Sequence, residues 1–351
     1  MAAPVRKPGA AFLSKATALN AISPQPIADW AEDYRAARME TAALLARLGL
    51  SAADFPAGVI DDPAFAVKVP PHWLGLMQPG NPRDPLLLQV LARGEEALPG
   101  GVTDPLAEAE FRAGDGIIRK YGSRALLLAS GACAIHCRYC FRRHYDYGDH
   151  ALKPAALDAA IERLAADPAI EEVILSGGDP LSLSDARLAA ILQGLARLPN
   201  LAAVRIHSRT ATTVPARITD DLLAVLAAAP APVVIVTHSN HAQELDDVVA
   251  DGLARLREAG VTLLNQAVLL AGVNDDVDSL AAHCRRLWAA GVLPYYVHLL
   301  DPVAGAGHFD VPLAHARALE QGLRDRLSGY LVPRFVREVP GQAAKTPIWQ
   351  L

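Results

Sequence analysis

Three cysteines lie within eight residues of this chain and could hold a metal centre. Cys133, Cys137 and Cys140 follow the spacing C-x3-C-x2-C, and Cys284 is the only other cysteine among 351 residues. Thiolates bind soft metals, and a closed zinc site usually takes four protein ligands. A four-iron cluster held by three thiolates keeps one iron without a protein ligand. The spacing therefore favours an iron–sulfur cluster whose open iron can bind a small molecule.

Two other interpretations of the three cysteines remain open from spacing alone. His136 or His144 could supply a fourth ligand and complete a zinc knuckle. The three cysteines could also be buried core residues, although their neighbours are Arg, His and Tyr. For Cys284, which lies in a helical pattern, a small buried apolar role is the expectation.

The stretch SGGDP is a second candidate for ligand contact. Its residues Gly177 and Gly178 follow a short apolar run, and two glycines allow the backbone to approach a ligand closely. Asp179 supplies an acceptor next to them. A plain turn is the alternative interpretation of Gly-Gly-Asp-Pro.

Further polar side chains follow later apolar runs. His238 stands in THSNH, Gln266 in LNQAVLL, and Asp301 after PYYVHLL. A hydrogen-bonded structural role is the alternative for each of them. Basic residues close to the cysteines, such as Arg138, Arg142 and Arg143, could hold one small anion.

Composition limits the classes of partner. The formal net charge is −5 and charged residues are spread along the chain, which argues against nucleic acid as the main ligand. No apolar run reaches the roughly 20 residues of a membrane helix. Charged residues, among them Lys15, interrupt the first 20 residues, so we predict neither a signal peptide nor an anchor. Clustered cysteines in a long chain do not resemble a disulfide framework, and we predict a cytoplasmic protein.

From Arg124 onward, short apolar runs alternate with longer amphipathic stretches, about six times. This order predicts parallel strands with crossover helices, and six units predict an open, partial (β/α)6 barrel. In such barrels the active site lies at the carboxyl ends of the strands. The predicted strands span 125–130, 171–177, 202–208, 232–239, 262–270 and 294–301. The predicted helices span 154–167, 185–198, 219–229, 243–260, 277–291 and 312–329.

We divide the chain into three parts. Residues 1–100 form an N-terminal helical region, in which a helix is expected over 29–50 with Asp29 as its N-cap. Residues 101–330 form the partial barrel, and residues 331–351 form a C-terminal tail. The N-terminal region shows no chemistry of its own.

The cysteine segment CAIHCRYC resembles the signature of the radical S-adenosylmethionine (SAM) superfamily. The resemblance implies a [4Fe-4S] cluster on the three cysteines and SAM bound to its open iron. SGGDP resembles the superfamily's GGE-type motif, which holds the SAM amino group. The residues that the resemblance assigns to SAM are Tyr139, Ser176, Gly177, Gly178, Asp179, His238 and Gln266.

The tail segment PGQAAKTP contains Lys345, and its composition alone suggests a solvated lysine. The segment resembles PGGGGKxP of lysine 2,3-aminomutases, in which this lysine binds pyridoxal 5'-phosphate (PLP). The similarity runs from residue 80 to the end of the chain and implies a PLP-lysine tail with Lys345 as the catalytic lysine. Its other segments include RIHSRT, THSNHAQEL, GVTLLNQAVLLAGVND and PYYVHLLDPVAGAGHF.

The same resemblance assigns further residues. Arg142 matches the arginine that binds the substrate carboxylate, and Asp301 matches one aspartate that binds the substrate ε-ammonium group. Glu338 occupies the place of a second aspartate, seven residues before the PLP lysine, and its side chain is longer. Arg124 matches an arginine that binds the PLP phosphate, and Lys120 stands where a second arginine does.

A zinc site found in longer members of the family is expected to be absent. Asp276 occupies the place of one of its cysteines, after the segment VND.

The family implies an isomerase that converts L-lysine to β-lysine by radical 1,2-amino migration. The chain resembles most the branch that makes β-lysine for elongation factor P, with a lysyl ligase as functional partner. An electron donor such as flavodoxin or ferredoxin and a homo-oligomer are also implied. The alternatives are an aminomutase that makes free β-lysine or acts on another amino acid, and a metal-stapled module that binds translation factors without catalysis.

Overall fold

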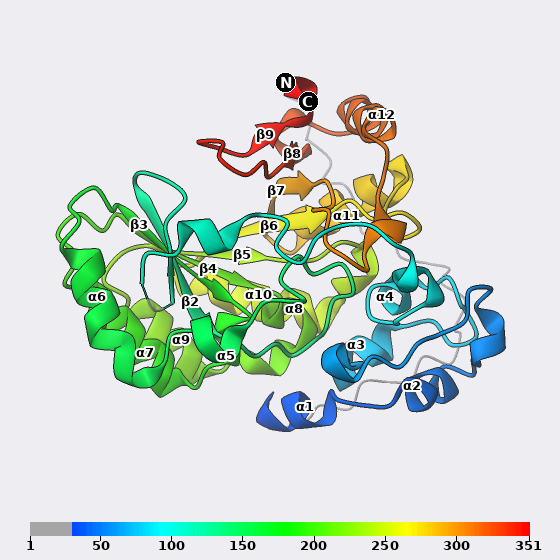
Figure 1. Cartoon of the computed structure of the whole chain (residues 1–351), viewed down its shortest axis with the longest axis horizontal. Coiled ribbons are helices and arrows are strands. Elements are labelled where there is room, and N and C mark those ends of the chain that lie inside the picture. The colour runs from blue at the N-terminus through cyan, green and yellow to red at the C-terminus, as the bar shows by residue number, and fades with distance from the viewer. Residues whose placement is uncertain (1–29, 115) are drawn as a thin grey trace, which may run out of the picture.

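Seven parallel strands form the centre of the molecule (Figure 1). The structure is a computed structural model that describes residues 30–114 and 116–351. The nine strands of its sheet follow one another in chain order, and only β1 and β9, at the two edges, pair antiparallel. The strands are β1 (Ile117–Ile118), β2 (Arg124–Ser130), β3 (Glu172–Gly177), β4 (Ala203–Ser208), β5 (Val233–Thr237), β6 (Thr262–Val268), β7 (Leu293–His298), β8 (Arg334–Arg337) and β9 (Thr346–Pro347).

Crossover helices connect these strands and cover one face of the sheet (Figure 1). They are α6 (Leu157–Ala165), α7 (Asp185–Leu195), α9 (Asp220–Ala227), α10 (Asp247–Glu258), α11 (Val277–Ala289) and α12 (Leu313–Arg324). The side chains of Ser184, Thr219, Asp246 and Asp276 accept hydrogen bonds from backbone N–H groups in the first turns of four of them. The predicted alternation of strands and helices is confirmed for β2 to β7.

Successive side chains along each strand point alternately to the apolar core under the helices and to the inside of the partial barrel. Leu175, Ile206 and Leu263 are fully or almost fully buried and belong to the cluster that packs under the helices. Because successive side chains point to opposite faces of a sheet, Ser176 and His207 face the inside. The inner face therefore carries polar groups, while the face under the helices is apolar.

The sheet does not end with the sixth predicted strand. Strand β8, which lies within the predicted tail, pairs parallel with β7, and β9 turns back onto β8. The register pairs Val336 with Pro347 and Arg337 with Thr346, and Gly341 turns the chain between them with a φ of 80°. The C-terminal segment is thus a hairpin that extends the sheet.

The N-terminal region contains two short helices where one was predicted. Helices α1 (Trp30–Ala36) and α2 (Thr41–Arg47) are separated because residues between them pair with another segment. The Val69 N–H donates to the carbonyl of Ala37, and the Met39 N–H donates to that of Val67. The single helix over 29–50 is therefore wrong, and its proposed N-cap Asp29 lies outside the described residues. Two further helices, α3 (Pro71–Leu76) and α4 (Pro85–Leu88), follow.

The N-terminal region also binds the segment between β2 and α6, which carries the cysteines. Arg138, a fully buried residue of this segment, donates from Nε and Nη2 to the Glu96 carboxylate at 2.7 and 2.5 Å. Arg143 donates to the same carboxylate at 2.8 Å. The idea that the basic residues here hold a small anion therefore does not fit, because carboxylates of the chain already pair with them.

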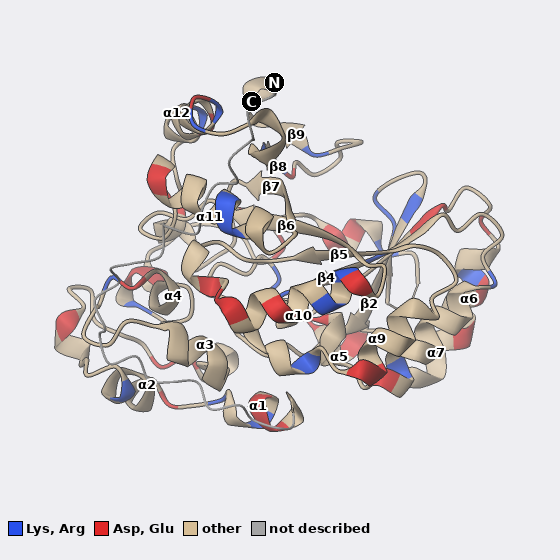
Figure 2. Cartoon of the chain, turned by 180° about the vertical axis from the view of Figure 1, so that it is seen from behind, with Lys and Arg blue, Asp and Glu red and all other residues tan. Residues whose placement is uncertain are grey.

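The helical exterior carries charges of both signs. Figure 2 shows both acidic and basic residues along α6, α7 and α10. Across the described residues, no helix combines the length and apolar character needed to cross a bilayer.

Replacing Glu96 with Gln tests whether the N-terminal region stabilises the cysteine segment. The change removes the nearer of two negative partners of the fully buried Arg138, the other being Asp62 at 3.3 Å, so we expect it to lower the free energy of unfolding by roughly 3–5 kcal/mol. Asp158→Asn, at an exposed ion pair with Arg197, serves as control and costs less than about 1 kcal/mol. Urea denaturation measures both values, and equal small losses would contradict the claim.

Candidate active site

The loop after β3 is joined directly to the backbone that precedes the first cysteine. The Gly178 N–H donates to the carbonyl of Ser130 at 2.7 Å, and the Asp179 N–H donates to that of Ala132 at 2.8 Å. A Cβ atom on Gly177 would lie 2.3 Å from the Ser130 oxygen, at a φ of +112°. The glycines are therefore required for this approach of two backbone segments.

The side chain of Asp179 has no acceptor position left for a ligand. One oxygen accepts from the Leu181 N–H and the Ser208 hydroxyl, and the other accepts from the N–H groups of Arg209 and Thr210, all at 2.8–2.9 Å. A carboxylate has about four lone-pair positions, and these are all used. These bonds tie the ends of β3 and β4 together, and the predicted contact of Asp179 with SAM stays a prediction.

The three clustered cysteines are free thiols that lie close enough to affect one another. Burial raises the pKa of Cys133 well above its usual range, and Asp179, Cys140 and Cys137 add to the shift. Burial likewise raises the pKa of Cys140 to about 11. A cationic centre bound to the thiolates would reverse these shifts.

A single-ion site does not form around the thiols. Within the described part of the chain, no three His, Cys, Asp or Glu side chains are placed to hold one metal ion. The two histidines of the zinc alternative face elsewhere: His136 Nδ1 bonds to the carbonyl of Ala66 at 2.8 Å, and His144 Nε2 bonds to that of Ala304 at 3.1 Å. A cluster gives each thiolate its own iron, so the arrangement fits a cluster better than a zinc ion.

Arg142 is buried and already holds a carboxylate of the chain. Its Nε and Nη2 donate to the two oxygens of Glu108 at 2.7 Å each, and Nη1 donates to Ser176 Oγ at 3.0 Å and to the Gly177 carbonyl at 3.2 Å. A guanidinium has five N–H donors, so one N–H of Nη2 remains. The predicted carboxylate contact of Arg142 stays a prediction, and it would use this single donor unless Glu108 moves.

Glu338 and Lys345 face each other across the C-terminal hairpin. The register of β8 and β9, continued by one residue, places them opposite each other, and Lys345 Nζ donates to Glu338 Oε2 at 2.7 Å. Lys120 Nζ and the Tyr121 hydroxyl donate to the other oxygen at 3.0 and 2.7 Å. Burial opposes ionisation of Glu338, but the charge and hydrogen bond of Lys345, with Lys120 and Tyr121, together outweigh it, and the pKa of Glu338 falls to about 2.

Asp301, after β7, is a carboxylate without a partner for one of its oxygens among the described residues. Its Oδ1 is buried and accepts no hydrogen bond. Burial raises the pKa of Asp301 to about 7, Lys345 acts in the opposite direction, and Glu338 raises it further. The two acids and the lysine therefore form one electrostatic group, and the orphaned oxygen fits a cationic ligand.

Three buried histidines lie near Lys345, and sequence reasoning assigned a role to only one of them. His238 accepts from the Gln266 amide at 2.9 Å, and burial lowers its pKa to about 3. His207 lies at 5.6 Å from its ring, and both His207 and His298 have a buried Nε2 without a partner within the described structure. His207 and His298 each follow a buried apolar residue in their strands, and this alternation was the signal that could have identified these two. Burial lowers the pKa of all three histidines, so they contribute neutral polar rings to the site.

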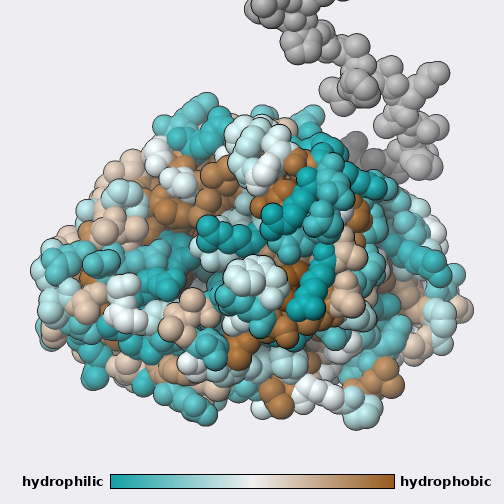
Figure 3. All heavy atoms as spheres, turned by 90° about the horizontal axis from the view of Figure 1, so that it is seen from above, coloured by the Kyte–Doolittle hydropathy of each residue, from teal (hydrophilic) through white to brown (hydrophobic). Residues whose placement is uncertain are grey.

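The remaining assigned residues lie at the rim. Arg124 stacks over the Tyr121 ring at 4.3 Å, and its guanidinium donates no hydrogen bond within the described part of the chain. Lys120, the other predicted phosphate ligand, instead pairs with Glu338. Of the two predicted phosphate contacts, Arg124 is thus the one whose charge is available. Figure 3, a view from above, shows hydrophobic residues in a hollow bordered by hydrophilic ones.

Comparisons with known proteins agree with this geometry. Residues 127–284 match the model of the radical SAM superfamily. The chain is 45% identical to an L-lysine 2,3-aminomutase of Escherichia coli, over 81% of this chain and 83% of that protein. The chain belongs to the L-lysine 2,3-aminomutase family. A relative from Haemophilus influenzae is 41% identical over 91% of this chain and 95% of its own length. One from Clostridium subterminale is 35% identical over 81% and 69%.

Membership of this family makes the chain an isomerase that uses a [4Fe-4S] cluster and SAM. The structure's own groups fit that requirement, because three mutually close thiols lie beside the cations of Arg142 and Arg209. The predicted fold class, a partial barrel of the radical SAM type, is confirmed.

Asp301→Asn tests the unpartnered carboxylate. The pKa of Asp301 is raised from 3.8 to about 7, so the native state binds the proton more tightly than the unfolded chain does. Wild-type stability therefore falls as pH rises through this window, and the variant does not share that loss. We expect the variant to gain up to roughly 4 kcal/mol over wild type between pH 4 and 8. Urea denaturation across this range, with Asp158→Asn as control, measures it, and a difference independent of pH would contradict the account.

Proposed function

We propose that the protein is a PLP-dependent L-lysine 2,3-aminomutase that converts L-lysine to β-lysine. The observation that carries this proposal is the group of Lys345, Glu338 and Asp301 at the mouth of a radical SAM barrel. Lys345 and Lys120 both donate to Glu338 there, and the Oδ1 of Asp301 has no partner among the described residues. A substrate with a second amino group is the ligand that such a group would select.

Each end of a lysine molecule has a proposed partner of matching charge. The remaining N–H of Arg142 would donate to the α-carboxylate, and Glu338 and Asp301 would accept from the ε-ammonium group. Glu338 already holds the ammonium of Lys345 at 2.7 Å, so its oxygen has the geometry for an amine. Once Lys345 is engaged by a cofactor, this oxygen becomes available for the substrate.

Lys345 is the proposed point of attachment for PLP, and Arg124 is the proposed contact of its phosphate. A lysine amine suits this role because it adds to carbonyl groups and can be displaced by a substrate amine. PLP would supply stabilisation of the migrating amino group's radical. Cys133, Cys137 and Cys140 are the proposed cluster ligands, and the cluster with SAM supplies the radical that starts the reaction.

The SAM contacts of the chain are also proposals. The backbone of Gly177 and Gly178, the hydroxyl of Ser176 and the rings of Tyr139 and His238 lie at or near the carboxyl ends of the strands. Gln266 would act through His238, to which it donates.

We further propose that the β-lysine serves modification of elongation factor P in the cytoplasm. The proposal follows the resemblance to the branch of the family that makes β-lysine for a lysyl ligase. Flavodoxin or ferredoxin is the proposed electron donor, and a homo-oligomer is the proposed assembly. Higher ligation to elongation factor P with the product than with L-lysine would support this fate.

An anaerobic assay tests the reaction. Protein reconstituted with iron, sulfide and PLP is incubated with SAM, a reductant and L-lysine, and the product is separated by chiral chromatography. β-Lysine is the expected product. Its absence, with cluster and PLP both loaded, would favour the non-catalytic module, and turnover of another amino acid would favour the alternative aminomutase.

Lys345→Ala tests the attachment of PLP. We expect the visible absorbance of protein-bound PLP to disappear, because the variant has no amine at the end of the hairpin. Lys153→Ala, at an exposed lysine of the barrel exterior, serves as control and retains the absorbance. Unchanged absorbance in Lys345→Ala would contradict the assignment.

Glu338→Gln tests the proposed contact with the substrate ammonium. Loss of one charged hydrogen bond in a buried site costs about 1.5–3 kcal/mol, so we expect the KM for lysine to rise roughly 10- to 100-fold. The kinetics of reconstituted wild type and variant measure this value. A KM within twofold of wild type would show that Glu338 does not bind the substrate.

A further inference from the structure

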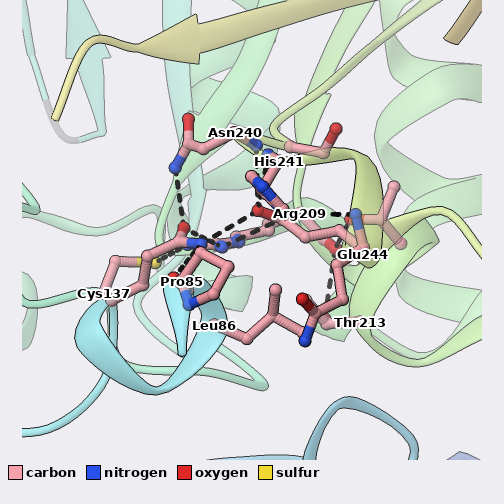
Figure 4. A network of polar contacts seen from close by, with 12 residues as sticks. Pro85, Leu86, Cys137, Arg209, Thr213, Asn240, His241 and Glu244 are labelled. Atoms are coloured by element: carbon pink, nitrogen blue, oxygen red, sulfur yellow. Dashed lines mark hydrogen bonds and ion pairs between the residues drawn. The ribbon is translucent and has the colours of Figure 1, made fainter. Parts of the chain in front are cut away.

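Arg209 is a buried arginine immediately after β4 that contacts one of the clustered cysteines (Figure 4). Its Nη1 donates to Cys137 Sγ at 2.7 Å and to the Tyr139 hydroxyl. Cys140 also accepts from the backbone of Arg142, so among the described residues Arg209 is the side chain that donates to a sulfur of the three cysteines. The contact joins the barrel to the cysteine segment at the second cysteine.

We propose that Arg209 raises the reduction potential of the cluster by donating an N–H to the Cys137 thiolate. The proposal rests on the proposed role of Cys137 as a cluster ligand. Reduction adds one electron from an external reductant and breaks no bond, so the added negative charge is stabilised by a nearby positive group. Hydrogen bonds to the sulfur ligands and net charge are among the factors that set cluster potentials.

The guanidinium is held in place from its other side. Nη2 donates to Gln89 Oε1 at 2.7 Å and to Glu244 Oε2 at 3.4 Å, and the Trp73 ring lies 4.6 Å from the guanidinium carbon. The backbone N–H of Arg209 donates to Asp179 at 2.8 Å. Its direction toward the sulfur is therefore fixed before any cluster binds, as a preorganised donor requires.

The buried network spreads the charge of the counter-ion away from the sulfur. Glu244 is fully buried, and its Oε1 accepts from the Asn240 N–H at 2.9 Å and from the Gln89 amide at 3.0 Å. Asn240 and Arg209 both donate to the Tyr139 hydroxyl. The guanidinium of Arg209 thus points at Cys137, while the carboxylate of Glu244 accepts from neutral donors.

The side chains of the other described cations near the cysteines do not donate to a cysteine sulfur. Arg142 and Arg143 are paired with Glu108 and Glu96, and Lys68 donates to the carbonyl of Cys133 rather than to its sulfur. Arg209 is therefore the cation whose removal is expected to affect a ligand sulfur most directly.

Redox titration of the reconstituted cluster tests the proposal without measuring turnover. Iron content is determined first, and the midpoint potential is then measured by visible and electron paramagnetic resonance spectroscopy in wild type and variants. Arg209→Gln is expected to shift the potential to more negative values, and Arg209→Lys to shift it less. Glu244→Gln removes the counter-charge but retains the arginine, so it is expected to shift the potential in the positive direction.

Arg217→Gln is the matched control, because Arg217 is also fully buried and paired, with Asp185, but donates to no cysteine. Its potential is expected to equal that of wild type. A full cluster with an unchanged potential in Arg209→Gln would overturn the proposal. Loss of the cluster in both Arg209 and Glu244 variants, with retention in the control, would also overturn it in favour of a purely structural arginine. If the wild-type protein binds no cluster, the result would contradict the proposed function rather than the role of Arg209.

Discussion

The pairing of β8 with β7 is the interaction on which the candidate active site depends. It brings Lys345 to the same mouth as the cysteines, although Cys140 precedes it by 205 residues. The hairpin register then sets Glu338 opposite Lys345, and β7 ends just before Asp301. Without this seventh parallel strand, Glu338 and Lys345 would not be held near Asp301 and the cysteine segment.

The cysteine half is held by contacts from two directions. From the barrel, the loop after β3 bonds to the backbone before Cys133, and Arg209 donates to Cys137. From the N-terminal region, Glu96 binds Arg138 within the same segment. A loop with little regular structure is thereby fixed by buried charge pairs, which are costly to break because removal of one partner leaves an uncompensated charge.

The sequence alone was sufficient for the parallel strands and the position of the polar groups. Near-continuous apolar runs predict a sheet covered by helices, and chemistry at strand ends follows from the way parallel strands align. It was not sufficient for β8, because a four-residue strand in a segment rich in Pro and Gly has too little periodicity. Nor could it show that Glu108 holds Arg142 or that the Asp179 carboxylate is saturated, since both depend on contacts between distant segments.

Two lysines contact the carboxylate of Glu338, and only one of them is the proposed PLP lysine. Lys345 and Lys120 lie at 2.7 and 3.0 Å from its two oxygens. The most direct measurement is borohydride reduction of the PLP-loaded protein, followed by peptide mass spectrometry to locate the pyridoxyl group. The account predicts a label on the C-terminal peptide that contains Lys345. A label on Lys120, or on neither lysine, would contradict it.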